Sequence, residues 1–108
     1  MMGNNGKVLW TGKLLPGKKE EYIERHNNIW PEMAADLKAQ GIYNYSIFNA
    51  GDEVIGYYEC DDLDRLRKIK AASTVAKRWT ESMQGIVEFP KEPDGVTNKI
   101  YEQIFYLN

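Results

Sequence analysis

Residues 42–60 read IYNYSIFNAGDEVIGYYEC. Two runs in this stretch, residues 42–48 and 53–60, are rich in aromatic and β-branched side chains, and the turn-forming sequence Asn49-Ala50-Gly51-Asp52 lies between them. Strand-forming runs on both sides of a short turn of this composition predict a β-hairpin. We therefore expect two adjacent antiparallel strands in the middle of the chain.

Large apolar side chains occupy both faces of this predicted hairpin. Strict alternation places Ile42 and Phe48 opposite Tyr43, Tyr45 and Ile47, and it places Ile55 and Tyr57 opposite Val54 and Tyr58. Helices can cover one face of a sheet, but a second apolar face requires a different cover. We expect this cover to be a second copy of the chain, packed sheet to sheet as a homodimer. The alternative is a loop over a ligand pocket.

The segments on either side of the hairpin predict further strands and helices. Alternation of polar and apolar residues predicts strands at 7–14 and 97–107. Helical spacing, with proline, glycine and capping residues at the ends, predicts helices at 18–26, 31–40 and 63–87, the last divided at Ser73-Thr74. The order β-α-β-β-α-β indicates an α+β fold of the ferredoxin-like type, a four-stranded antiparallel sheet with helices on one face.

Length, composition and charge exclude several classes of protein. The 108 residues carry a net charge of −2, which offers no basic surface for nucleic acid. No stretch resembles a membrane span or a signal peptide, so we expect no membrane partner. The single cysteine, Cys60, cannot form an internal disulfide, and a cytoplasmic location is expected. We expect one domain at residues 7–108, after a polar leader at residues 1–6.

His26 is the only histidine of the chain, and histidine is the side chain whose ordinary pKa suits proton transfer near neutral pH. It lies four residues after Tyr22, so the two side chains would project from one face of a helix. The alternative is that His26 only caps the C-terminal end of that helix, where positive charge is favourable. The residues by themselves leave both roles open.

Aromatic residues are unusually frequent in this chain. Seven tyrosines and three tryptophans exceed what a core of this size requires, and such rings stack on sugars and on other flat ligands. Tyr45 and Trp79 would meet His26 only if the sheet and the helices enclose a common cavity. Trp10 and Tyr101 are expected to be structural.

Other polar residues give weaker signals. The acidic residues at 20–21 and 61–62 and Glu59 are typical of solvated or helix-capping positions, the alternative being that one of them orients the His26 ring. Cys60 is expected to be a small buried side chain rather than a nucleophile. No phosphate-binding loop, dinucleotide fingerprint, zinc spacing or calcium loop occurs. We therefore expect chemistry without a nucleotide, flavin or metal cofactor.

Residues 22–32 read YIERHNNIWPE, which closely resembles the opening helix motif of the L-rhamnose mutarotases. That motif has a tyrosine, then two or three residues, then His-Asn-x-Ile-Trp-Pro-Glu. The resemblance continues through residues 41–47, 72–79 and 103–107, so it covers nearly the whole chain after the leader. It implies a dimeric α/β barrel of ferredoxin-like subunits.

The same resemblance implies a set of site residues. In the family, the histidine corresponding to His26 donates a proton, and the residues corresponding to Tyr22, Tyr45 and Trp79 line the sugar site. The family has a second tryptophan directly after the first, where this chain has Thr80. Loss of an indole from the pocket wall would admit a differently substituted sugar.

The implied reaction interconverts the α and β anomers of L-rhamnose or a related 6-deoxyhexose. The ring opens when its oxygen is protonated and the anomeric hydroxyl loses a proton, and it recloses after the aldehyde turns. His26 would be the acid, and Tyr22 or a bound water would carry the other proton.

Two other interpretations are open. One is a cofactor-free haem-degrading or quinol monooxygenase of the dimeric barrel type, built on His26, Asn44 and Trp79. The other is a non-catalytic module that binds a small molecule in an aromatic pocket.

Overall fold

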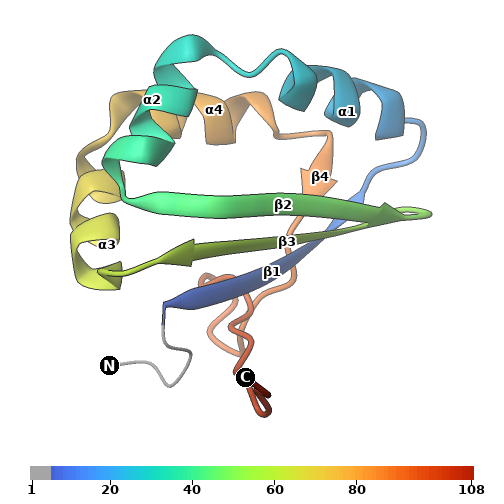
Figure 1. Cartoon of the computed structure of the whole chain (residues 1–108). Helices are drawn as coiled ribbons and strands as arrows, with labels where there is room; N and C mark the ends of the chain where they lie inside the picture. Colours follow the sequence, from blue (N-terminus) through green and yellow to red (C-terminus); the bar gives the residue numbers. More distant parts are fainter. Residues whose placement is uncertain (1–5) are drawn as a thin grey trace.

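The computed structural model of the protein describes residues 6–108, and this range contains one four-stranded antiparallel sheet and four helices (Figure 1). The elements are, in chain order, β1 (Lys7–Leu14), α1 (Lys19–Asn27), α2 (Pro31–Ala39), β2 (Ile42–Ala50), β3 (Glu53–Cys60), α3 (Leu63–Ala72), α4 (Thr74–Ser82) and β4 (Val87–Glu88). The strand order in the sheet is β2-β3-β1-β4. The predicted α+β class and the four-stranded antiparallel sheet are confirmed, with two helices in each helical connection, but the last strand is formed by other residues than predicted. The predicted leader, residues 1–6, lies outside the described residues except for Gly6.

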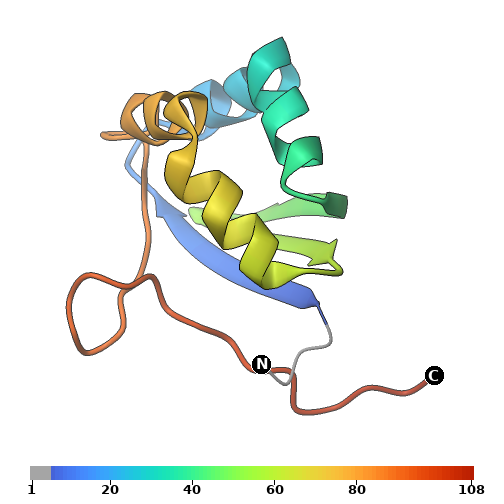
Figure 2. The same ribbon diagram turned by 90° about the vertical axis from the view of Figure 1, so that its left-hand side faces the viewer.

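The helices cover one side of the sheet, and the segment after β4 passes to the other side (Figure 1, Figure 2). This layered arrangement puts α1, α2 and α4 above the strands that carry the aromatic side chains. Within the described range, no helix has the length and apolar character needed to cross a membrane.

The predicted breaks between helices occur where local chemistry begins a new helix. Pro31 is the first residue of α2, where its missing N–H costs no hydrogen bond. Ser73 ends α3 and caps α4, because its hydroxyl accepts a 3.0 Å hydrogen bond from the Ala76 N–H. Asp62 caps α3 in the same way. The sequence therefore predicted both helix pairs correctly.

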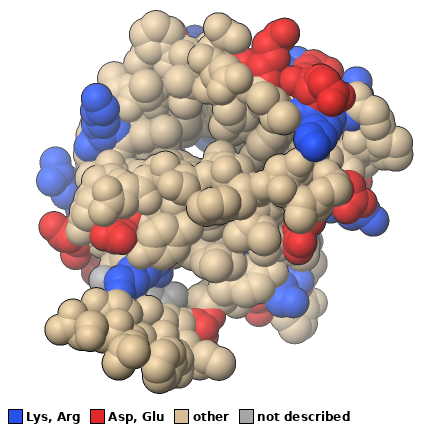
Figure 3. Space-filling view, turned by 45° about the vertical axis from the view of Figure 1, so that its right-hand side comes forward, with Lys and Arg blue, Asp and Glu red and all other residues tan. Residues whose placement is uncertain are grey.

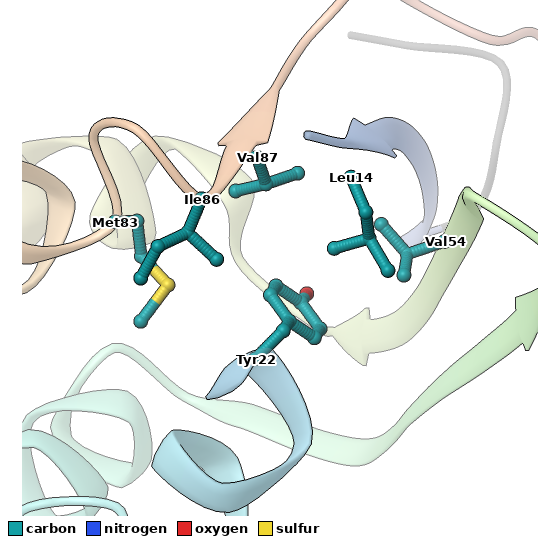
Figure 4. Packing of buried hydrophobic residues seen from close by; sticks show 6 residues of the cluster. All are labelled: Leu14, Tyr22, Val54, Met83, Ile86 and Val87. Atoms are coloured by element: carbon teal, nitrogen blue, oxygen red, sulfur yellow. The ribbon is translucent and has the colours of Figure 1, made fainter. Parts of the chain in front are cut away.

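A compact apolar cluster joins the helices to the sheet. Its members are Leu14, Tyr22, Val54, Met83, Ile86 and Val87. Figure 4 shows Tyr22 projecting from α1 toward the side chains of the strands and of the segment after α4. Burial of one side chain of this size contributes on the order of 2 kcal/mol. The Arg25 guanidinium strengthens the contact by donating a 2.6 Å hydrogen bond to the Ser82 carbonyl at the end of α4. Helix α1 is thus fixed against α4 and β1.

A β-bulge in β2 changes which side chains share a face of the hairpin. The register against β3 shifts between Tyr43 and Ser46, and Asn44 has a φ of 50°. Asparagine tolerates this left-handed conformation better than most residues, and the extra residue changes the alternation. Ile42 and Tyr45 consequently line the same cavity under the helices. The prediction that they face opposite ways is wrong, because it assumed strict alternation.

The fourth strand is formed by residues that the sequence placed at the end of a helix. Helix α4 ends at Ser82, and Gly85, with a φ of 81°, turns the chain back toward the sheet. Val87–Glu88 then pairs with Lys13 and Leu14 of β1. The predicted helix end near Val87 is wrong because the apolar spacing continues through Ile86 and Val87, which are buried as core residues without being helical.

Residues 97–107, which the sequence predicted as a strand, form no strand in this structure. The Tyr101 hydroxyl lies 2.8 Å from the Thr11 hydroxyl, and the Lys7 ammonium lies 3.6 Å from the centroid of the Tyr106 ring. Most of the large apolar side chains of this segment are exposed, namely Ile100, Ile104, Phe105, Tyr106 and Leu107. The prediction fails because alternation produces a strand only when a neighbouring strand supplies hydrogen bonds and apolar cover.

Candidate active site

A cavity of about 710 Å³ lies between the helices and the sheet. Its lining includes all four residues that the sequence predicted as a site: Tyr22 and His26 from α1, Tyr45 from β2 and Trp79 from α4. Figure 3 shows a hollow between the helical part of the molecule and the strands, with uncharged atoms around its margin. Residues far apart in the sequence thus meet in one chamber, as their predicted common role requires.

Two aromatic rings surround the imidazole of His26. The ring of Tyr22 lies 4.3 Å away between centroids, and the ring of Trp79 lies edge-on at 5.3 Å. The Nδ1 atom of His26 lies 2.9 Å from the Tyr22 carbonyl oxygen. A carbonyl only accepts, so Nδ1 carries the proton and donates it, and Nε2 holds the free lone pair of the neutral ring. Within residues 6–108, the orientation of the ring therefore comes from the backbone of α1 and from no carboxylate.

Burial changes the charge state of this imidazole. Loss of water around the ring lowers the pKa of His26 below its ordinary value, and the hydrogen bond to the Tyr22 carbonyl opposes this shift only in part. His26 is therefore mainly neutral at pH 7. In this state Nε2 can accept a proton, and the protonated ring can then return it.

The tyrosine hydroxyls of the cavity stay protonated. Burial raises the pKa of Tyr45 to about 12, and burial also raises the pKa of Tyr22. Neither residue serves as a base at neutral pH, and both can donate hydrogen bonds to oxygen atoms of a ligand. Their rings, with that of Trp79, supply apolar surface of the kind that packs on the C–H face of a sugar.

The charged residues around the cavity are all basic. No Asp or Glu of the described residues lines it, whereas Lys7, Arg67, Lys70, Lys91 and Lys99 do. The acidic pairs noted in the sequence lie elsewhere, as the capping role of Asp62 on α3 shows. A carboxylate of the described chain is therefore not available as a second proton carrier. In the same range, no group of three or more His, Cys, Asp or Glu residues is placed to hold a metal ion.

A model of the L-rhamnose mutarotase family matches residues 7–107. The chain belongs to this family. The L-rhamnose mutarotases of Oceanobacillus iheyensis and Bacillus subtilis are 34% and 39% identical to it, over 86% and 84% of this chain and 89% and 88% of theirs. A crystal structure of an L-rhamnose mutarotase from Formosa agariphila superposes with a TM-score of 0.70 at 29% identity, covering 94% of this chain and 98% of that chain. The family interconverts sugar anomers, which makes the chain an isomerase that acts on carbohydrates.

The site differs from the monooxygenase arrangement that the sequence left open. Asn44 does not join His26 and Trp79 in the cavity. It is exposed on the bulge of β2, and its amide donates a 3.4 Å hydrogen bond to Glu59. The three residues of that alternative are therefore not assembled in the described chain.

Sequence reasoning gave no site role to several residues that line this cavity, among them Trp10, Tyr58 and Tyr101, the last of which was also expected to be structural. Trp10 was expected to be structural, but its indole lines the cavity and its N–H donates a 3.1 Å hydrogen bond to the Tyr45 hydroxyl. Tyr58 also lines the cavity, and its ring lies 5.1 Å from that of Tyr45. Alternation along the strands places both residues on the helix side of the sheet, so the signal was present. Alternation alone does not distinguish a side chain packed in the core from one that lines a cavity on the same face.

The low pKa of His26 predicts a pH effect on stability. An unfolded histidine has a pKa of about 6.5. Because the folded pKa lies lower, the unfolded state binds more protons between the two values, and stability falls as the pH decreases through this window. Above about pH 6.5 the contribution of His26 to the free energy of unfolding no longer changes with pH.

NMR titration of the imidazole ring protons should give a pKa below the ordinary value. In urea denaturation, the free energy of unfolding of the unmodified protein should fall between neutral and mildly acidic pH. The His26→Asn variant should not show this part of the fall. A ring that titrates at or above the ordinary histidine pKa would contradict the neutral resting state.

Proposed function

We propose that this chain interconverts the α and β anomers of L-rhamnose or a related 6-deoxyhexose. In this proposal His26 is the catalytic residue, and Tyr22, Tyr45 and Trp79 bind the sugar. The observation that carries it is the position of the imidazole, in a ring-walled cavity with Nδ1 bound to the backbone and Nε2 free among the described residues. Residues 7–108 would act as one mutarotase domain.

The neutral imidazole favours an order of proton transfers that begins with a base. Nε2 of His26 takes the proton of the anomeric hydroxyl, the bond between the anomeric carbon and the ring oxygen breaks, and the ring oxygen gains a proton. Both oxygens are bonded to the same carbon, so one imidazolium beside that carbon can return the proton to the ring oxygen. After the aldehyde turns about one bond, the reverse transfers close the ring. In this order His26 acts first as a base and then, once protonated, as the acid that the sequence predicted.

The remaining lining supports a neutral sugar as substrate. The rings of Trp79 and the tyrosines offer flat apolar surface, and the protonated hydroxyls of Tyr22 and Tyr45 offer hydrogen-bond donors. A 6-deoxyhexose combines a C–H face and a methyl group with several hydroxyl acceptors. Thr80 lines the cavity next to Trp79, so a change of size at this position would act on the bound sugar directly.

His26→Asn should reduce anomer exchange at least about 100-fold, because it removes the group that moves the protons. Saturation-transfer NMR on L-rhamnose measures the exchange, and calorimetry measures sugar binding. We expect binding and thermal unfolding to stay close to those of the unmodified protein. Undiminished exchange in the variant would remove His26 from the mechanism. Sugar binding without exchange in the unmodified protein would favour the non-catalytic module.

Thr80→Trp should shift the relative rates toward L-rhamnose by about threefold or more, because an added indole at the wall gains stacking surface. The measurement compares kcat/KM across L-rhamnose, L-fucose and related 6-deoxyhexoses. Thr80→Val is the matched control, since it removes the hydroxyl without adding a ring. Identical relative rates for all three proteins would contradict a role for this wall in sugar selection.

A homodimer that completes an α/β barrel is the second part of the proposal. The sheet face away from the helices exposes Leu9 to 39% and Phe48 to 62%, and the segment after β4 on that side exposes further apolar side chains. Exposure of an apolar sheet face to water is unfavourable in free energy, and the same face of a second copy would cover it. This arrangement would also give the exposed apolar side chains of residues 97–107 a surface to pack on.

Sedimentation velocity should find a dimer at micromolar concentration. Phe48→Glu combined with Leu9→Glu should weaken the dimer at least about tenfold, because two charges would be buried without partners. Ile23→Glu is the matched control, since Ile23 is also exposed, at 43%, but lies on α1. A monomeric parent protein, or equal weakening by the control, would contradict sheet-to-sheet packing.

We infer a cytoplasmic location for this enzyme. Cys60 is a free thiol and is buried between the sheet and the helices, where it donates a weak hydrogen bond to the Gln40 carbonyl at 3.5 Å. A free structural cysteine suits a reducing compartment.

A further inference from the structure

We infer that Trp10 is a positioning residue of the site, which holds the Tyr45 hydroxyl so that its proton points to the bound sugar. The inference rests on the proposed function and adds a residue to it. It follows from three features of the sheet: a seat for the indole at Gly56, a hydrogen bond of fixed direction, and the bulge that precedes Tyr45.

Gly56 provides the seat for the indole. Trp10 of β1 and Gly56 of β3 are direct partners in the antiparallel register. The Trp10 ring lies over Gly56, and a Cβ atom at this position would overlap the indole. The ring of Phe89 also packs edge-on against the indole, at 5.7 Å between centroids. The indole is thus held in a fixed plane against the floor of the cavity.

The hydrogen bond between Trp10 and Tyr45 has only one possible direction. An indole N–H donates and cannot accept, so the Tyr45 oxygen is the acceptor at 3.1 Å. The hydroxyl proton of Tyr45 is therefore not used in this contact. Within the described residues the Tyr45 hydroxyl has no other hydrogen bond, and burial raises the pKa of Tyr45 to about 12. The proton is retained and available to an oxygen of a ligand in the cavity.

The bulge brings the Tyr45 ring within reach of this indole. The φ of 50° at Asn44 turns Tyr45 to the helix side of the sheet, where its ring meets Tyr58 at 5.1 Å and Trp10 at the hydroxyl end. Two rings and one donor therefore restrict the orientation of a single hydroxyl. Such restriction lowers the entropy that the hydroxyl loses when it binds a sugar oxygen.

Trp10 also supplies an indole to the sheet side of the cavity. Trp79 lies on α4 on the opposite side, and Thr80 beside it contributes no ring. The cavity consequently has one indole on each wall, and a pyranose between them would meet an apolar ring from both directions. Trp10→Phe would keep an aromatic ring on this wall, so its effect reports on the hydrogen bond to Tyr45.

Trp10→Phe keeps an aromatic ring on Gly56 but removes the indole donor. We expect KM for L-rhamnose to rise about fivefold with kcat changed by less than about twofold, because the lost contact orders a binding group rather than the proton carrier. Tyr45→Phe should raise KM by a similar factor. The double variant should be no weaker than Tyr45→Phe alone, since Trp10 would act through a hydroxyl that is already absent. Additive effects would overturn the positioning role.

Tyr43→Phe is the matched control on the same strand. The Tyr43 hydroxyl is exposed and donates to Asp61 at 2.7 Å, away from the cavity, so its loss should leave both kinetic constants unchanged. Gly56→Ala tests the seat, because the added methyl group must displace the indole, and it should raise KM at least as much as Trp10→Phe.

A second measurement separates this inference from the proposed function. In ¹⁵N-labelled protein, the indole N–H signal of Trp10 should move upfield in Tyr45→Phe, since it loses its acceptor, and should shift when L-rhamnose is added to the unmodified protein. An indole signal that is unchanged in Tyr45→Phe would overturn the contact whatever the activity. A protein that shows both shifts but no anomer exchange would overturn the proposed function and leave the contact established.

Discussion

Tyr22 lies buried at the centre of the apolar cluster, and the geometry of the site depends on this burial. Helix α1 is short and mostly charged, so it has few other apolar groups with which to bind the sheet. Inserting Tyr22 among the core residues fixes the rotation of the helix about its axis. His26, four residues later, is thereby turned toward the cavity, with its ring over that of Tyr22 and Nδ1 on the Tyr22 carbonyl. One core side chain thus positions the imidazole that we propose as the proton carrier, determines which of its ring nitrogens is free and shields the ring in part from water.

The electrostatic character of the cavity follows from this apolar, ring-lined wall. Burial favours the neutral imidazole and the protonated phenols, and no acidic residue of the described chain lies along the lining. Anomer exchange requires little more than a group that takes and returns a proton beside the anomeric carbon, because the reaction also proceeds slowly in water. A single imidazole with fixed orientation is sufficient for such chemistry. In the proposed function, the aromatic walls hold the sugar and exclude water.

The two faces of the sheet have different roles. The helix side carries the cavity, and its aromatic residues Trp10, Tyr45 and Tyr58 are ordered by contacts with one another. The other side carries exposed apolar residues such as Phe48, and the segment at 97–107, whose large apolar side chains are mostly exposed, passes to that side. The helices cover only one of these faces. The proposed dimer would account for the other face and would shield the sheet that forms the floor of the site.

Local sequence determined the helices and the hairpin, and it was sufficient to select the four candidate site residues that line the cavity. Pro31, Ser73 and Asp62 begin helices through their own backbone and side-chain chemistry, and the His26 motif is contiguous, so these features do not require knowledge of the fold. Tertiary structure decided the rest. The bulge at Asn44, the short strand at Val87–Glu88 and the absence of a strand at 97–107 depend on which partners are available across the sheet, and alternation along one chain does not contain that information. For the same reason, the contacts of Trp10 with Gly56 and Tyr45, on which its proposed role rests, became visible only in the folded chain, because a hydrogen bond across strands depends on their register.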